Sequence, residues 1–162
     1  SNEKFDIELA LQAINWLQNV TALKIEPTNP AKGFQDQFDF AEALKDGIAL
    51  CQLMNVLSPG LITKINTKKT PFKERENVEM FLNVCEAYGL KNSDLFQVND
   101  LYEKKNVHKV VNCLHAIAAL AVKKGFIGPT MDDVQAPVSH KKRIHFAEQK
   151  LESKSSETRI QR

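Results

Sequence analysis

Residues 44–55 read Leu44-Lys45-Asp46-Gly47-Ile48-Ala49-Leu50-Cys51-Gln52-Leu53-Met54-Asn55, and this stretch decides the fold. Apolar residues recur in it, and on both sides of it, in steps of three and four, which places them on one face of a helix. Gly47 lies in the middle of the pattern, where glycine costs roughly 1 kcal/mol relative to alanine. A helix that accepts this cost usually has another segment packed closely at that point. The pattern predicts one buried helix over residues 39–57, with Asp39 as its N-cap.

The same periodicity predicts three further helices, over residues 5–20, 74–88 and 106–124. Short helical turns are expected at 93–96 and 99–103. No segment of useful length alternates with period two, so the fold class is all-α: a bundle of four main helices with short connecting helical turns. The residues expected in the structural core are Trp16, Leu44, Gly47, Leu50, Phe81, Leu101 and Leu114.

The charge of the chain is uneven, although its net value is only +2. Residues 138–162 carry seven Lys and Arg against three Glu, so this tail is +4 and residues 1–137 are −2. Lys141, Lys142 and Arg143 form the basic patch of the tail. The imbalance permits an acidic partner for the tail without demonstrating one. The length of 162 residues and the apolar fraction of 43% suit one domain with a packed core.

The three cysteines, Cys51, Cys85 and Cys113, each fall within an apolar helical pattern. Buried reduced thiols are therefore expected, which favours a cytoplasmic protein. The longest purely apolar run, residues 116–122, is far too short to span a bilayer. The first residues, 1–4, do not have the composition of a signal peptide.

No enzyme motif is present in the sequence. It has no glycine-rich phosphate loop and no His-Glu-x-x-His or Cys-x-x-Cys pair. Cys113 and His115 are too close for ordinary zinc spacing, and the run from Asp94 has Phe96 and Val98 where a calcium loop needs oxygen ligands. We therefore expect a non-catalytic protein with no metal and no cofactor.

One irregular segment, residues 61–75, is strongly basic. Its charged residues are Lys64, Lys68, Lys69, Lys73 and Arg75 against Glu74, a local charge of +4. Two interpretations stay open for this segment: a solvated loop, or a binding surface for an acidic partner.

Four groups of residues, in this order along the chain, resemble the calponin-homology (CH) domain. They are Trp16-Leu17 with Val20-Thr21; Leu44-Lys45-Asp46-Gly47-Ile48 with Leu50-Cys51; Glu76-Asn77-Val78 with Phe81-Leu82; and Leu95-Phe96 with Asn99-Asp100-Leu101-Tyr102-Glu103, Asn106, Val110 and Leu114-His115-Ala116. Together they cover residues 5–124. The stretch 104–116 is especially similar to single CH domains, as in calponin, transgelin, IQGAP-type scaffolds and Vav-type exchange factors.

The resemblance implies a four-helix CH fold without catalysis, in which Gly47 allows a close approach near Trp16. It also implies that actin contacts come from the first helix, the loop before the third main helix, and the closing helix. The residues in these regions are Gln12, Asn15 and Gln18, then Lys68, Lys69 and Lys73, then Lys104, Lys105, His108 and Lys109. The actin filament is acidic, so basic side chains would steer docking.

The expected organisation is a CH domain over 3–125, followed over 126–162 by a linker and basic tail with a short helix near 146–151. Two functions stay open. The first is an actin-binding module of the cytoskeleton, weak on its own. The second is a regulatory or scaffolding domain, as in a Rho-family exchange factor or an IQGAP-like scaffold, acting through protein or intramolecular contacts. Nucleic acid is not an expected partner, because the basic clusters lack interleaved aromatic residues. A membrane is a weak alternative, since the three tail charges contribute only about 1 kcal/mol each.

Overall fold

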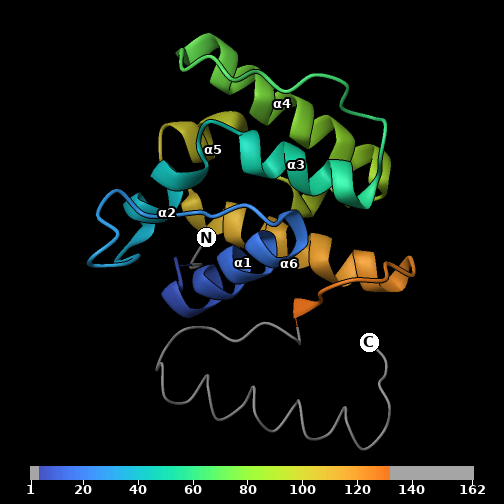
Figure 1. Ribbon diagram of the computed structural model, residues 1–162, viewed down its shortest axis with the longest axis horizontal. Helices are drawn as coiled ribbons and strands as arrows, with labels where there is room; N and C mark the ends of the chain where they lie inside the picture. Colours follow the sequence, from blue (N-terminus) through green and yellow to red (C-terminus); the bar gives the residue numbers. More distant parts are fainter. Residues whose placement is uncertain (1–3, 132–162) are drawn as a thin grey trace, which may run out of the picture.

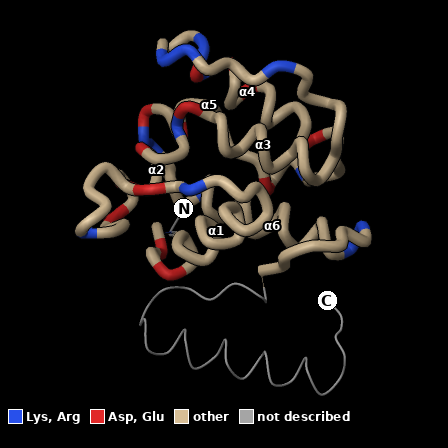
Figure 2. Tube along the Cα trace, in the orientation of Figure 1, with Lys and Arg blue, Asp and Glu red and all other residues tan. Residues whose placement is uncertain are grey.

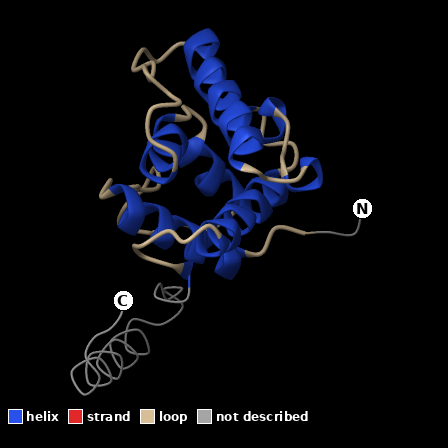
Figure 3. Cartoon of the chain, turned by 90° about the vertical axis from the view of Figure 1, so that its right-hand side faces the viewer, coloured by secondary structure: helices blue, strands red, loops and turns tan. Residues whose placement is uncertain are grey.

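The structure, a computed structural model, describes residues 4–131 of the chain. This part contains six α-helices, one short 3₁₀ turn and no strand (Figures 1 and 3). The elements in chain order are α1 (Ile7–Thr21), α2 (Gln37–Leu44), α3 (Ile48–Leu57), α4 (Pro71–Tyr88), the 3₁₀ turn (Asn92–Asp94), α5 (Val98–Tyr102) and α6 (Val107–Lys123). The all-α prediction is confirmed, and the four longest helices, α1, α3, α4 and α6, are the main helices of the bundle.

The helices lie in two layers. Figure 1 shows α3 and α4 above α1 and α6, with α2 and α5 closing one end between them. α3 packs against α4 on one side and α1 on the other, while α6 packs against α1, α2 and α5. None of the helices within residues 4–131 is both long enough and apolar enough to cross a membrane.

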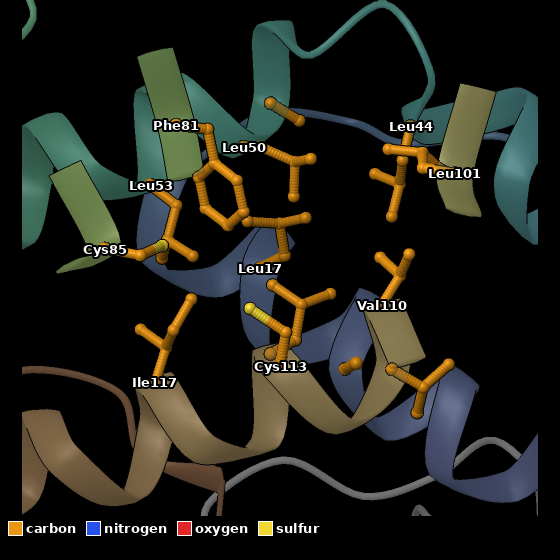
Figure 4. Close-up of a cluster of buried hydrophobic side chains, with 14 of the residues drawn as sticks. Leu17, Leu44, Leu50, Leu53, Phe81, Cys85, Leu101, Val110, Cys113 and Ile117 are labelled. Carbon is orange, nitrogen blue, oxygen red and sulfur yellow. The ribbon is translucent and has the colours of Figure 1, made fainter. Parts of the chain in front are cut away.

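The core fills the space between these layers. Side chains from α1, α3, α4 and α6 converge there, as the labelled residues of Figure 4 show. All seven residues expected in the core are buried: Trp16, Leu44, Gly47, Leu50, Phe81, Leu101 and Leu114. The three cysteines are also buried and free of disulfide bonds.

The predicted continuous helix over 39–57 is wrong, because the chain forms two helices there. α2 ends at Leu44 and α3 begins at Ile48, and Gly47 stands between them with φ of +75°. This left-handed conformation suits glycine and does not occur inside a right-handed helix. The Asp46 carboxylate accepts a hydrogen bond from the Ile48 N–H at 3.0 Å, which satisfies a free donor at the start of α3.

The starts of α2 and α4 also differ from the prediction. Asp36, not Asp39, caps α2, and its carboxylate accepts hydrogen bonds from the N–H groups of Phe38 and Asp39. α4 begins at Pro71, three residues before the predicted start, because Thr70 caps it and proline suits the first helical position. Gly89, with φ of +120°, is the C-cap of α4.

The chain after α6 turns back over α1. The buried indole of Trp16 donates a hydrogen bond from Nε1 to the Pro129 carbonyl at 2.9 Å. Met131 packs against the core, and Phe126 is half-buried. We name residues 126–131 the strap, because this segment covers Trp16.

Candidate partner-binding surface

The basic loop before α4 is fixed in place by the buried side chain of Asn77, which is only 1% exposed. Asn77 Nδ2 donates to the carbonyl oxygens of Asp46 and Asn66, each at 2.8 Å. Asn77 Oδ1 accepts from the Asn66 N–H at 2.9 Å. These bonds join the loop, α4 and the corner between α2 and α3, so the loop has a defined shape rather than that of a freely solvated segment.

The start of α4 projects from the end of this loop. Thr70 Oγ1 accepts a hydrogen bond from the Lys73 N–H at 3.3 Å and caps the helix. Lys68, Lys69 and Lys73 gather there, and Figure 2 shows Lys and Arg concentrated where α4 begins. Phe72 lies among them and is 69% exposed. The expectation that the basic clusters lack interleaved aromatic residues is therefore wrong for this one.

The lysines at this helix end differ in how far their charge is neutralised. Lys69 Nζ lies 2.5 Å from Asp46 Oδ2, and this hydrogen bond raises the pKa of Lys69. Lys73 Nζ lies 3.7 Å from Glu76 Oε1. Within residues 4–131, the exposed Lys68 makes no ion pair. Of these three lysines, Lys68 is therefore the one whose charge is not neutralised by a carboxylate within residues 4–131.

The second predicted basic group precedes and opens α6. Lys104 Nζ lies 2.7 Å from Glu42 Oε1, and this hydrogen bond lowers the pKa of Glu42. Lys105 Nζ lies 3.3 Å from Glu103 Oε1. Lys109 is exposed and makes no ion pair in the part of the chain that the structure describes.

Tyr102, at the end of α5, contacts the start of α4 and Lys45 after α2. Its hydroxyl donates to Glu74 Oε1 at 2.7 Å, and Arg75 and Lys45 lie 4.5 and 5.0 Å from the ring centroid. Burial, followed by the bond to Glu74, raises the pKa of Tyr102. Arg75 also pairs with Glu103 at 3.2 Å. α5 contacts both α4 and α6, so the two basic groups lie on neighbouring elements.

These residues form what we name the α4–α6 surface. It consists of Lys68, Lys69, Phe72, Lys73, Arg75, Tyr102, Lys104, Lys105, His108 and Lys109. Figure 1 shows its elements, the start of α4, α5 and the start of α6, along one side of the molecule.

The predicted residues of α1 lie elsewhere. Gln12, Asn15 and Gln18 are half-buried, and α1 packs against α3 and α6. Gln18 Oε1 accepts a hydrogen bond from the Ile25 N–H at 2.7 Å, so this carboxamide holds the loop after α1. The tail patch Lys141, Lys142 and Arg143, and the helix predicted near 146–151, lie outside the described residues.

Sequence reasoning missed two residues of this region, Phe72 and Asn77. Phe72 was detectable, since Thr70-Pro71 is a helix-start signal and an aromatic residue follows it directly among lysines. The role of Asn77 depends on contacts with Asp46, 31 residues away, which no local pattern encodes. Among residues 4–131, no group of three or more His, Cys, Asp and Glu could hold a metal ion.

The comparisons with known proteins agree with this architecture. The model of the calponin homology (CH) domain matches residues 8–123, and the chain belongs to this family. It is 34% identical over 143 residues to calponin-2 of Sus scrofa, covering 88% of this chain and 44% of calponin-2. It is 36% identical over 114 residues to Rac guanine nucleotide exchange factor B of Dictyostelium discoideum, covering 70% of this chain and 9% of that protein.

A solved structure of autoinhibited Vav1 matches with a TM-score of 0.61 and 31% identity, covering 74% of this chain and 24% of the Vav1 chain. The chain therefore spans less than half the length of each of these three proteins. The predicted family is confirmed, and a calponin and exchange factors, two of the kinds of relative that the sequence resembles, are among the matches.

Proposed function

We propose that this CH domain is a non-catalytic module that binds filamentous actin through the α4–α6 surface and associates with the cytoskeleton. The observation that carries this proposal is the basic loop fixed by Asn77 at the start of α4. A loop without fixed shape would lose conformational entropy on binding, whereas this one presents its lysines already in place. Membership of the CH family supports actin as the acidic partner.

The charges on this surface predict how binding depends on salt. Lys68 and Lys109 are exposed and make no ion pair within residues 4–131, so an acidic filament would attract them over several ångströms. Lys69, Lys73, Lys104 and Lys105 have carboxylate partners and contribute less. Because exposed charges are screened within about 8 Å at 0.15 M ionic strength, binding should weaken as salt rises. A single small domain buries a modest interface, so we expect a Kd on the order of micromolar or weaker.

Co-sedimentation of the whole chain with filamentous actin at two salt concentrations tests this function. The matched variants are Lys68→Glu with Lys109→Glu, and Lys32→Glu with Lys91→Glu, which change two exposed lysines on other loops. We expect the first pair to weaken pelleting and the second pair to leave it unchanged. Failure of the unmodified chain to pellet at tens of micromolar actin would exclude direct binding.

We propose that the basic tail adds a second contact to the same filament. Two linked weak contacts bind more tightly than either alone, because the second forms at high effective concentration. The triple variant Lys141→Gln, Lys142→Gln and Arg143→Gln should then weaken pelleting of the whole chain, most strongly at low salt. Equal pelleting of this variant would remove the tail from the interface.

A second candidate function is regulation of a signalling protein, supported by the matches to the Rac exchange factor and to autoinhibited Vav1. In this role the domain would contact another protein or another part of its own chain. Nucleotide exchange on Rac by an exchange factor that lacks its own CH domain, measured with and without this chain, tests the role. A lower exchange rate supports it, and an unchanged rate at high micromolar concentrations argues against it.

A further inference from the structure

The most exposed aromatic side chain within residues 4–131 is Phe72, at 69%. By contrast, Phe40 and Phe81 are buried in the core. A large apolar side chain left in water gives nothing to the fold, whereas its burial against a partner is strongly favourable. Phe72 is therefore a large apolar side chain that is exposed to water at the start of α4 without stabilising the fold.

Phe72 is held on a rigid support. It lies in the first turn of α4 and directly follows Pro71, whose ring restricts the backbone. Thr70, before Pro71, is the N-cap of the helix. One turn and a half further along the helix, Asn77 fixes the preceding loop through Asn66. A rigid aromatic residue loses little conformational freedom when it binds, which is a property of the residues that dominate protein interfaces.

The surroundings of Phe72 are cationic. Lys73 Nζ lies 5.6 Å from the centroid of its ring, and Lys68 and Lys69 precede it on the loop. The surface that complements this arrangement has an apolar pocket with carboxylates around its rim. Acidic protein surfaces offer this chemistry, in which the lysines set the orientation and the aromatic ring supplies the buried contact.

We propose that Phe72 is the anchor residue of the α4–α6 surface, and that it inserts into an apolar pocket bordered by carboxylates on the acidic filament. This inference rests on the proposed function and adds the residue that determines affinity. Lysines of the same surface act at longer range and mainly set the rate and salt dependence of association.

Phe38 supplies a matched control. It is 52% exposed, in the first turn of α2, and its neighbours in the helix, Asp36 and Asp39, are acidic. Lys105 and His108 line the same surface hollow as Phe38, so this ring lies at the edge of the α4–α6 surface with charges of both signs around it. The two phenylalanines therefore share residue type and helix position, but only Phe72 lies among lysines on its own helix and the preceding loop.

The experiment is co-sedimentation of the whole chain with filamentous actin at 50 and 200 mM salt. We expect Phe72→Ala to raise the Kd at least about tenfold, as for a dominant interface residue, and by the same factor at both salt concentrations. Phe72→Leu should recover part of the affinity, and Phe38→Ala should bind like the unmodified chain. Circular dichroism melting of each variant checks that the fold is retained.

The outcomes separate the two proposals. If the unmodified chain does not pellet, the actin-binding function and the anchor role both fail. If it pellets and Phe72→Ala binds equally well, or if Phe38→Ala loses as much affinity, only the anchor role fails. Loss of pelleting by Phe72→Ala with phosphatidylserine vesicles, but not with filaments, would assign the ring to a lipid surface and overturn the inference.

Discussion

A Cβ atom added to Gly47 would lie 2.6 Å from the Cβ of Asn77, closer than side chains approach in folded proteins. Gly47 also has φ of +75°, so glycine is required there both for the backbone conformation and for the contact with α4. The close approach expected near Trp16 is therefore wrong, because the atoms nearest to Gly47 belong to Asn77 and Val78. This contact brings the corner between α2 and α3 against the residue that fixes the basic loop. The fold and the candidate surface therefore depend on the same pair of residues.

Gly47→Ala should be strongly destabilising. The left-handed backbone alone costs alanine about 1–2 kcal/mol, and the clash with Asn77 should bring the total to about 3 kcal/mol or more. Gly33 is a matched control, since its φ is +74° and an added Cβ would have no heavy atom within 4 Å. Urea unfolding of the two variants measures the difference, and equal losses for both would mean that the contact with Asn77 contributes nothing.

Asn77→Ala should release the basic loop. It removes three hydrogen bonds, to the Asp46 carbonyl and to the backbone of Asn66, and should lower the free energy of unfolding by roughly 2–4 kcal/mol. Hydrogen exchange at the Asn66 amide should accelerate more than exchange in the centre of α6. Asn83→Ala, at an exposed position of the same helix, is the control and should change neither quantity appreciably.

Shortening the chain to end at Lys124 should uncover Trp16, the only tryptophan in the sequence. The cut removes the strap and with it the Pro129 carbonyl that accepts the indole hydrogen bond. We expect a red shift of tryptophan emission and a loss of about 1–2 kcal/mol of stability. A chain that ends at Met131 should keep the emission of the whole chain. Identical spectra for both shortened chains would show that the strap does not shield the indole.

Alkaline conditions should destabilise the fold partly through Cys51. Burial raises the pKa of this thiol to about 12 from an ordinary value of 9.0. Because the folded state holds the proton more tightly, the stabilisation is complete below pH 9 and is lost as pH rises towards 12, by about 1.4 kcal/mol per pH unit for one thiol. Lys69, Tyr88 and Tyr102 also have raised pKa values and act in the same direction.

Cys51→Ala separates the contribution of Cys51 from those other groups. The free energy of unfolding, measured from pH 8 to 11 in both proteins, should fall less steeply in the variant. Parallel pH curves would contradict the assignment to this thiol. At neutral pH the raised pKa also predicts that Cys51 reacts with alkylating reagents only when the protein unfolds.

The sequence was sufficient for the fold class and for most helices, because those depend on apolar spacing within single segments. It failed at Gly47, where the periodicity continues unbroken across the corner between α2 and α3. The break depends on Asp46 and Asn77, which meet only after α4 has packed. An apolar pattern records which residues are buried but not where the backbone changes direction.

The candidate surface was predicted less completely than the fold. The basic positions were visible as a charge count, but their partners were not. Lys69 pairs with Asp46 across 23 residues, and Lys104 pairs with Glu42 across 62. These pairs reduce the charge available to a partner, and they result from packing between helices rather than from local sequence. Among the predicted lysines, Lys68 and Lys109 therefore have the charges most available to an acidic partner, because neither makes an ion pair within residues 4–131.

The strap changes how the domain would respond to mechanical load. We propose that the folded unit extends to Met131, six residues beyond the predicted boundary at 125. Tension applied to the chain after Met131 would reach the hydrogen bond between Pro129 and Trp16 before it reached α6. The core contact of Met131 would break first and then this bond, and the helices would stay assembled while the strap lengthened. If the domain is attached to filaments under tension, the strap would lengthen reversibly before the helices separate. Tryptophan emission would then report whether the strap still covers Trp16.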